Sequence, residues 1–288
     1  IKEHVIKTSR GSIVDRNNVV LAESILLDSL IITNTKEFLK DTEAIKSLCD
    51  LLNKDYEELL KEIANRENKS FTYVKKGRYL SEKIANQIKI LNLKGVEFIK
   101  EFQRYYPEGE AISPLIGLTD FHHNGQMGLE KSFNKILSGK DGKKIVMRDR
   151  HGKIVKEIKK LKNPVEGKKL FLTIDTRLQY IAYRELKKQI NEVNAKSGSI
   201  VIMDTTNGDI LATASYPSHD PHNRKTYSPE KERNRVIIDS LEPASTIKPF
   251  VLAAALHSEK VNLNDSFDTN PGYKVWGNKT YEDIKNLG

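Results

Sequence analysis

Residues 198–216 read GSIVIMDTTNGDILATASY, and this stretch decides the fold class. Two apolar segments flank Asn207-Gly208, a pair that is typical of the tight turn of a β-hairpin. Upstream, residues 169–174 have the composition of a strand, and residues 175–193 carry apolar side chains at helical spacing. The order strand, helix, strand, turn, strand predicts an antiparallel sheet with helices packed on it, an α+β fold.

The amino-terminal part of the chain alternates short predicted strands and helices. Strands are predicted at 26–33, 71–75 and 96–103. Helices are predicted at 42–64, as a pair broken near Asn53 with Asp55 capping the second, at 81–91 with Ser81 as the cap, and at 128–137. A boundary near Asn163-Pro164 divides a first domain, residues 1–165, from a second, residues 166–288.

The amino-acid composition excludes several classes of protein. The 288 residues are 38% apolar and carry a net charge of +9, which excludes a disordered tail or a collagen-like fibre. No apolar run reaches 18 residues, so we expect no membrane-spanning helix in this sequence. A single cysteine, Cys49, excludes a disulfide framework and a cysteine-rich metal site. The sequence begins at Ile1 rather than Met, so any targeting segment is expected upstream.

Most of the charge lies in one segment. Residues 131–162 hold 12 basic and 3 acidic side chains. One interpretation is a surface that binds a polyanion, either nucleic acid or anionic lipid. The alternation of residues 143–150 instead favours a solvated, lysine-rich hairpin. No aromatic side chains are interleaved to stack bases, which argues against a single-strand nucleic-acid surface.

The most informative peptide for chemistry is EPASTIKP at 242–249. A helix predicted from Ser245 to His257 would place Ser245 and Lys248 one turn apart on the same face. At a helix start, free backbone N–H groups can stabilise an oxyanion. The positive helix end and partial burial would disfavour an ammonium, so Lys248 could accept the Ser245 proton. An ordinary helix cap is the alternative role of Ser245.

The Ser-x-x-Lys pattern alone is weak, because the chain contains it three times. Ser132 falls within the predicted helix 128–137, where backbone donors are occupied, and Ser228 precedes Pro229 in a charged loop. Only Ser245 is followed by an apolar helical segment. It is therefore the candidate nucleophile.

Other polar clusters point to structural roles. The segments His219-Asp220-Pro221-His222 and His122-His123 are predicted turns rather than metal sites. Arg233-Asn234-Arg235 could bind an anion, but its context favours bracing a loop. No phosphate-binding glycine loop occurs, and we expect neither a metal nor a cofactor.

Several ordered motifs together resemble the class B penicillin-binding proteins, closest to the division-specific (septal, FtsI-type) peptidoglycan transpeptidases. The matching segments are Arg10-Gly11-Ser12-Ile13-Val14-Asp15-Arg16-Asn17 with Leu21-Ala22, Arg104-Tyr105-Tyr106-Pro107-Glu108-Gly109, Ile116-Gly117-Leu118-Thr119, Gly125-Gln126-Met127-Gly128-Leu129-Glu130, Leu172-Thr173-Ile174-Asp175 with Leu178-Gln179, and Arg233-Asn234-Arg235 followed by Glu242-Pro243 and by Ser245 with Lys248. Ser-x-x-Lys belongs to this superfamily's motif set. The resemblance runs over most of the chain.

The resemblance implies a mechanism. Residues 1–165 would form a non-catalytic pedestal of the dimerisation type, and residues 166–288 would begin the transpeptidase domain. Ser245 would attack the penultimate D-alanine carbonyl of a stem peptide, with Lys248 as general base, and β-lactams would acylate Ser245. Structural roles would fall to residues of the pedestal motifs, namely Arg10, Gly11, Asp15, Arg16, Arg104, Pro107, Gly128 and Glu130.

The resemblance also implies partners and a location. Partners would be peptidoglycan stem peptides, β-lactam antibiotics and other division proteins, including a lipid II glycosyltransferase, but no nucleic acid. The protein would face the periplasm on the bacterial inner membrane, held by a single-pass anchor upstream of residue 1.

Two departures from the family pattern stand out. Ala244 occupies a position where the family usually has glycine, and a positive φ there would be costly for alanine. No Lys-Thr-Gly occurs, and the only Ser-x-Asn, Ser132-Phe133-Asn134, lies in the pedestal, so the remaining motifs would follow Gly288. Alternatives to a septal transpeptidase are an elongation-branch enzyme, a non-catalytic scaffold docking division partners, a β-lactamase or β-lactam sensor, and a basic nucleic-acid-binding protein.

Overall fold

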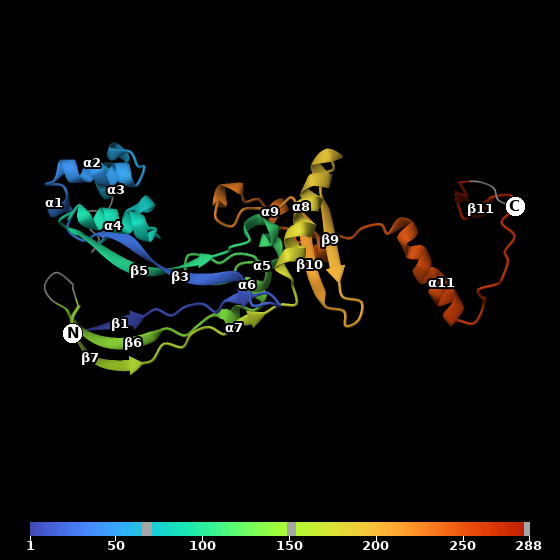
Figure 1. The fold of residues 1–288 in the computed structure, drawn as a ribbon, viewed down its shortest axis with the longest axis horizontal. Helices are drawn as coiled ribbons and strands as arrows, with labels where there is room; N and C mark the ends of the chain where they lie inside the picture. Colours follow the sequence, from blue (N-terminus) through green and yellow to red (C-terminus); the bar gives the residue numbers. More distant parts are fainter. Residues whose placement is uncertain (65–70, 149–153, 285–288) are drawn as a thin grey trace. The chain divides into compact units, whose positions relative to one another are not determined.

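A computed structural model describes residues 1–64, 71–148 and 154–284 of the protein. The chain forms two units, Ile1–Asp239 and Ser240–Gly288, which are described separately (Figure 1). The first unit holds the predicted pedestal together with residues 166–239. The predicted boundary near residue 165 stays a prediction.

A five-stranded sheet organises the first unit. Its long strand β3 (Val20–Ile32) pairs with β5 (Val96–Tyr105) over ten residues and continues the sheet through β2 (Ile13–Val14). The remaining strands are β4 (Thr72–Tyr73) and β8 (Leu170–Phe171). Because β2 and β8 run parallel, residues after the predicted boundary join the same sheet as the first motif.

Four helices pack against one end of this sheet: α1 (Thr35–Phe38), α2 (Thr42–Leu51), α3 (Tyr56–Ala64) and α4 (Glu82–Ile90). Their starts follow the predicted capping, since Asp55 accepts from Glu58 N–H and Ser81 from Ile84 N–H. A hydrophobic core forms between helices and sheet, including Leu30, Phe38, Ile45, Leu48, Leu59 and Ile88. The predicted helix pair and the helix after Ser81 are confirmed.

A separate three-stranded sheet carries the basic segment. Strand β6 (Gly142–Arg148) pairs with β1 (Lys2–Ile6) on one side and β7 (Ile154–Lys162) on the other. The lysine-rich hairpin is therefore confirmed, and all nine residues of β7 are exposed. Of the strand predicted at 143–150, residues 149 and 150 lie outside the described residues.

Short helices connect the two sheets: η2 (Gly109–Ala111), α5 (Ser113–Ile116), α6 (Gly128–Ser132) and α7 (Asn134–Leu137). The single helix predicted at 128–137 is wrong, because Phe133 leaves helical geometry at φ −103°, ψ 20° and separates α6 from α7. Ser132 is thus the last residue of a short helix, not a mid-helix residue.

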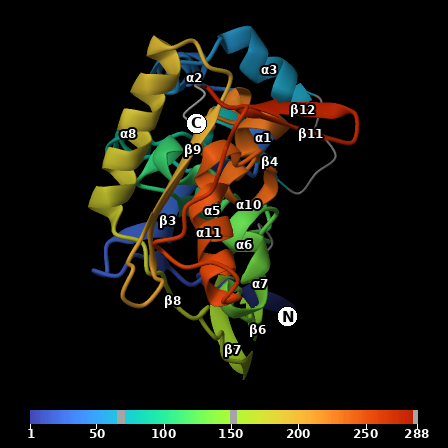
Figure 2. The ribbon, with the colours of Figure 1, turned by 90° about the vertical axis from the view of Figure 1, so that its right-hand side faces the viewer.

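The hairpin and helix that decided the fold class are present. Helix α8 (Thr176–Glu192) begins at its Asp175 cap and packs on β9 (Gly198–Met203) and β10 (Ile210–Tyr216), which are antiparallel (Figures 1 and 2). The core between them includes Ala182, Tyr183, Leu186, Ala212 and Ala214. The short elements η3 (Arg224–Thr226), α9 (Pro229–Glu232) and α10 (Arg235–Ile238) complete this unit. The α+β prediction is confirmed.

The second unit contains η4 (Ala244–Ile247), α11 (Lys248–His257), and a hairpin of β11 (Tyr273–Trp276) with β12 (Lys279–Glu282). None of the helices in residues 1–64, 71–148 and 154–284 combines the length and the apolar character that crossing a bilayer requires.

Candidate active site

The candidate nucleophile lies on a 3₁₀ turn that leads into α11. Ser245 belongs to η4, and the backbone N–H of Lys248 donates to the Ser245 carbonyl. Side chains three residues apart eclipse in a 3₁₀ turn, so Ser245 and Lys248 share one face. The same bond satisfies a carbonyl that Pro249 cannot serve, because proline has no N–H. The predicted helix end at His257 is confirmed, while its first turn is 3₁₀ rather than α.

The turn before Ser245 has an uncommon backbone. Ala244 adopts φ +46°, the left-handed region that favours glycine. The Thr246 hydroxyl and N–H both contact the Pro243 carbonyl, which closes the turn. The residue just before the candidate nucleophile is therefore an alanine in a backbone conformation that is unfavourable for it, as expected from the sequence.

Helix α11 is apolar around its circumference and open to solvent within its unit. Phe250, Val251 and Leu252 are 72%, 61% and 53% exposed. Helices of this composition are ordinarily buried in a domain core. Ser245 and Lys248 are exposed as well, so the partial burial expected for Lys248 is not found in the described part of Ser240–Gly288.

The arginines that precede this segment brace the end of the first unit. Arg235 is buried, and its guanidinium pairs with Asp239 at 3.3 Å, while Arg233 pairs with the same carboxylate at 2.5 Å. The Arg235 backbone N–H also donates to Ser215 Oγ. Bracing, rather than anion binding, is the role that these contacts give the two arginines.

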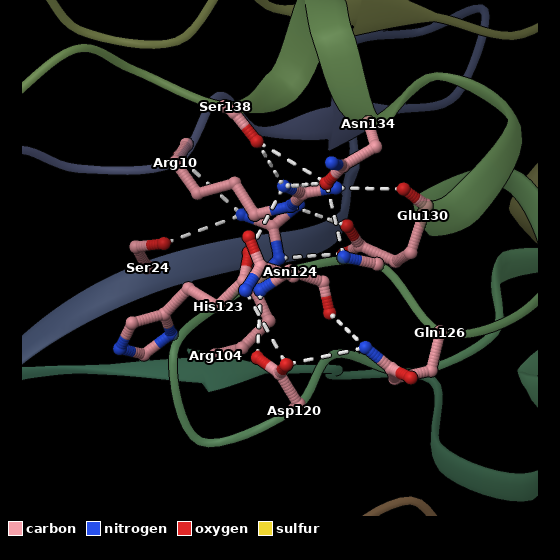
Figure 3. Close-up of polar contacts among 11 residues, drawn as sticks. Arg10, Ser24, Arg104, Asp120, His123, Asn124, Gln126, Glu130, Asn134 and Ser138 are labelled. Atoms are coloured by element: carbon pink, nitrogen blue, oxygen red, sulfur yellow. Dashed lines mark hydrogen bonds and ion pairs between the residues drawn. The ribbon is translucent and has the colours of Figure 1, made fainter.

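Three of the predicted pedestal residues meet in one buried cluster (Figure 3). Glu130 is fully buried, and its carboxylate accepts from Arg10 Nε at 2.5 Å and from Arg104 Nε at 2.7 Å. Arg10 also donates to the Glu130 carbonyl, and to Asn134 Oδ1 at 2.8 Å. The cluster ties β5, the chain before β2 and helix α6 together.

The sequence did not single out Asn134 as a member of this cluster. Its Oδ1 accepts from both Arg10 and the Gly125 N–H, and Ser138 Oγ accepts from Arg10 at 2.9 Å. In the sequence, Asn134 stands out only as part of the Ser132-Phe133-Asn134 match. Its distance in sequence from Arg10 leaves no local signal that could have revealed the contact.

Glycines of the motifs allow close backbone approaches. A Cβ on Gly11 would lie 2.0 Å from the Lys168 carbonyl oxygen, so only glycine lets these segments come together. Gly128 has φ +55°, and a Cβ there would lie 2.6 Å from the Leu115 carbonyl oxygen. These two motif glycines have a steric reason in the fold.

Asp15 joins the first motif to the start of α8. It is buried, and its carboxylate accepts from the N–H of Asn17 and Val19, and from both the N–H and hydroxyl of Thr176. Burial alone would raise the pKa of Asp15, but hydrogen bonds from Thr176, Val19 and Asn17 hold it below its ordinary value. Arg16 adds a backbone bond to the Ile174 carbonyl.

The other predicted motif residues sit at the surface of this region. The Arg16 side chain and Pro107 are exposed, and Pro107 follows the end of β5. Contacts of their side chains do not explain why the motifs contain them.

Gln179, which accompanies the Leu172-Thr173-Ile174-Asp175 motif, makes contacts that the sequence did not predict. Its amide donates to the Ala111 carbonyl at 2.7 Å and the Thr213 carbonyl at 2.9 Å, and accepts from Thr213 N–H at 2.8 Å. A buried polar side chain on the apolar face of a predicted helix is the one signal that could have marked it. It fastens α8 to both η2 and β10.

Histidines of the 219–222 segment contact backbone carbonyls. His219 is buried with Nδ1 3.4 Å from the Lys231 carbonyl, and His222 Nε2 lies 2.9 Å from the Tyr106 carbonyl. His122 is exposed as predicted, but His123 is half-buried, so the exposed turn was wrong for that residue. Burial and the charges of Arg104 and Arg10 lower the pKa of His123. Among the described residues, no group of three or more His, Cys, Asp or Glu side chains could hold a metal.

Two domain families match the chain. The penicillin-binding protein dimerisation domain matches residues 5–172, and the penicillin-binding protein transpeptidase domain matches residues 198–287.

Curated relatives match nearly the whole chain. It is 38% identical over 284 residues to the probable peptidoglycan D,D-transpeptidase PbpC of Pseudomonas aeruginosa, covering 99% of this chain and 50% of the relative. It is 37% identical over 280 residues to the peptidoglycan D,D-transpeptidase FtsI of Escherichia coli (strain K12), covering 95% of this chain and 47% of the relative. The chain spans about half the length of the curated relatives it matches.

Solved structures share the fold. Penicillin Binding Protein 2X from Streptococcus thermophilus superposes with a TM-score of 0.69 at 24% identity, covering 96% of this chain and 44% of that one. PBP2 in its complex with MreC from Helicobacter pylori gives 0.68 at 23% identity, covering 99% and 57%. At this identity the likeness concerns the fold.

Proposed function

Because this chain belongs to the penicillin-binding proteins, we propose that it is part of a septal peptidoglycan D,D-transpeptidase with Ser245 as its nucleophile. The observation that carries the proposal is local. Ser245 and Lys248 share one face of the turn that starts an apolar helix, within the segment matched by the transpeptidase family. The FtsI name of one relative supports the division branch.

The chemistry proposed is acyl transfer. Lys248 Nζ takes the proton from Ser245 Oγ, which attacks the penultimate D-alanine carbonyl of a stem peptide. The peptide bond to the last D-alanine breaks, and this D-alanine leaves with the proton on its amine. The amine of a neighbouring stem then attacks the Ser245 ester, forming the cross-link and returning a proton to Oγ. A β-lactam enters the same first step and stays attached, because its leaving group is tethered.

The remaining residues of such a site are proposed to lie outside these 288 residues. Helix α11 is apolar and uncovered within its unit, which supports a domain that includes further chain. We also propose that the protein faces the periplasm, held in the inner membrane by a single-pass anchor upstream of residue 1. Division proteins, including a lipid II glycosyltransferase, are the proposed partners of the pedestal.

The test is the intact mass of the full-length protein before and after incubation with benzylpenicillin. We expect the mass to rise by one drug molecule, with the adduct on the peptide containing Ser245. Ser245→Ala abolishes the adduct, and Lys248→Ala slows its formation by orders of magnitude. Ser132→Ala and Ser228→Ala are matched controls, because each serine also precedes a lysine by three residues. Ser228 instead accepts from Lys231 N–H as the cap of α9.

The alternative functions predict different results in this mass measurement. A non-catalytic scaffold gives no adduct, and a β-lactamase gives one that disappears quickly with release of hydrolysed drug. Depletion in cells separates the two synthetic branches, because loss of a septal enzyme blocks septation while the side wall continues to grow.

A further inference from the structure

Strand β7 departs from regular pairing in a repeating way. Its register with β6 shifts three times, between Lys143 and Lys144, between Ile145 and Val146, and between Met147 and Arg148. Each shift leaves one residue of β7 without an opposite residue, and these are Val155, Ile158 and Leu161. They recur every third position, and all three are apolar and exposed, at 62%, 46% and 45%. We call these three residues the apolar ridge.

Lysines surround this ridge. Strand β7 also carries Lys156, Lys159, Lys160 and Lys162, all exposed, and its one acidic residue, Glu157, pairs with Lys144 at 2.8 Å. Lys159 lies opposite Ile145 and Lys160 opposite Lys144, which are consecutive residues of β6. Successive residues of a strand project to opposite faces, so lysines flank β7 on both sides of the sheet.

The register shifts and the lysines of β7 argue against its pairing with a further strand or with a second copy of the chain. The three register shifts interrupt the regular spacing of N–H and C=O groups that a docking strand needs. A second copy of β7 would set lysine against lysine, which is unfavourable. An apolar ridge bordered by lysines is instead the composition of segments that rest at the surface of an anionic bilayer.

The position of this sheet in the unit supports the same occupant. Strand β1 pairs with β6 so that Lys2 lies opposite Val146, and Ile1 is 83% exposed beside it (Figure 1). With the anchor suggested under the proposed function, the chain would leave the membrane at this end. Val5 and Met147 add exposed apolar side chains to the same sheet, at 44% and 40%.

We propose that the β1–β6–β7 sheet is a lipid-contacting surface, which docks along β7 on a bilayer rich in anionic phospholipid. The apolar ridge enters the headgroup region, and the lysines on both faces reach phosphate groups. The inference relies on the proposed function only for the nearby anchor. It goes beyond a tether, since it fixes how the pedestal is held against the membrane.

The first experiment measures co-sedimentation of the purified chain with vesicles. We expect binding to mixed phosphatidylglycerol and phosphatidylethanolamine vesicles, weakened by salt, and at least about tenfold weaker binding to phosphatidylcholine alone. The triple variant Lys156→Glu, Lys159→Glu, Lys160→Glu should bind anionic vesicles at least about tenfold more weakly. The control Lys46→Glu, Lys61→Glu, Lys83→Glu has the same net charge, alters exposed lysines on α2, α3 and α4, and should bind like the unmodified chain.

The second experiment tests the ridge. In a Trp276→Phe background, Ile158→Trp should be quenched by brominated phosphatidylglycerol and shift its emission to the blue. Ile90→Trp is the control, because Ile90 on α4 is 81% exposed and distant from β7 in sequence. Its emission should stay unchanged on adding vesicles.

Several outcomes would overturn the proposal. Equal loss in both triple variants would make binding a matter of overall charge, and equal binding to phosphatidylcholine would remove the role of anionic lipid. If Ile90→Trp were quenched as strongly as Ile158→Trp, the apolar ridge would have no specific role in contacting lipid. A chain that ignores vesicles but binds polyglutamate would have an acidic polypeptide as its partner instead. Ser245 takes no part in these assays, so their failure is distinguishable from failure of β-lactam acylation.

Discussion

Arg10 Nε lies 2.5 Å from Glu130 Oε2, although the two residues are 120 positions apart, and neither side chain is more than 2% exposed. Two motifs that look independent in the sequence are therefore parts of one buried ion cluster. A buried charge is tolerated only when it is paired and hydrogen-bonded. The Glu130 carboxylate also accepts a hydrogen bond from Arg104. Removing this carboxylate therefore leaves two buried guanidinium groups without a counterion.

Replacing Glu130 tests this cluster. Glu130→Gln should lower the free energy of unfolding by about 3–5 kcal/mol, because two buried guanidinium groups lose their charge partner. Urea denaturation followed by circular dichroism measures the change. Glu157→Gln is the control, since Glu157 is exposed and its pair with Lys144 is screened by solvent, so its loss should change stability far less. Similar losses in both variants would contradict the importance of burial.

The close approach at Gly11 gives a second prediction. Gly11→Ala should destabilise the protein by more than about 2 kcal/mol, because its methyl group would overlap the Lys168 carbonyl and separate β2 from β8. Gly208→Ala is a matched control with no neighbour within 4 Å, so it carries only the penalty of φ +82°, about 1 kcal/mol. Thermal unfolding compares the two, and equal shifts would rule out the steric explanation.

Ala244 offers a stabilising substitution. Ala244→Gly removes the penalty of φ +46° and should raise the free energy of unfolding by about 0.5–1 kcal/mol, part of the gain being offset by the freer unfolded chain. Differential scanning calorimetry of the full-length protein is the measurement. Ala255→Gly, within α11, should instead lower stability by about 1 kcal/mol. A loss in both variants would mean that Ala244 does not hold a left-handed conformation.

Gln179 should contribute more to the stability of the fold than Gln189, the other glutamine of α8. Gln179→Ala leaves the Ala111 carbonyl and both backbone groups of Thr213 without their buried partner, at a cost of at least about 2 kcal/mol. Gln189→Ala, at an exposed position of α8, should change stability by less than about 0.5 kcal/mol. Chemical denaturation distinguishes them, and a neutral Gln179→Ala would show that water replaces the amide.

The histidines give a pH dependence with a defined sign. Burial lowers the pKa of His219 and His123 below the ordinary 6.5. Below that pH the unfolded chain binds protons that the folded chain does not, so stability is full above 6.5 and falls as the pH drops. Asp15 does not contribute in this window, because its stabilisation is lost only below its ordinary value of 3.8.

Melting temperatures at about pH 7.5 and about pH 5.5 measure the effect. The drop should be smaller in the double variant His219→Gln, His123→Gln than in the unmodified protein. His122→Gln is the neighbouring control, because His122 is exposed and should leave the drop unchanged. An undiminished drop in the double variant would assign the pH dependence to other groups.

Local features of the fold were predictable where the signal lay within one segment. The Asn207-Gly208 turn, the Asp175 cap and the Asp55 cap each depend on residues a few positions apart, and each is found as expected. The single helix at 128–137 was wrong because apolar spacing continues through Phe133, while the backbone of Phe133 leaves helical geometry, which apolar spacing does not reveal.

Long-range contacts were not predictable from pattern. Ser245 and Lys248 could be proposed because they lie three positions apart, at a recognisable helix start. Asn134 and Gln179 could not, because their partners are backbone and side-chain groups that only the folded chain brings near. The register shifts of β7 could not be predicted either, because composition does not determine strand register.

The parallel pairing of β2 with β8 has a consequence for biosynthesis. Ile13 pairs with Leu170 in the sheet, so this pairing cannot form until Leu170 has been synthesised. The roughly 160 residues between them take ~8–30 s to synthesise at 5–20 residues per second. Until then the edge of β2 is an unpaired strand, which is a risk for wrong association. The sheet that contains β2 and β8 can therefore be completed only late in synthesis.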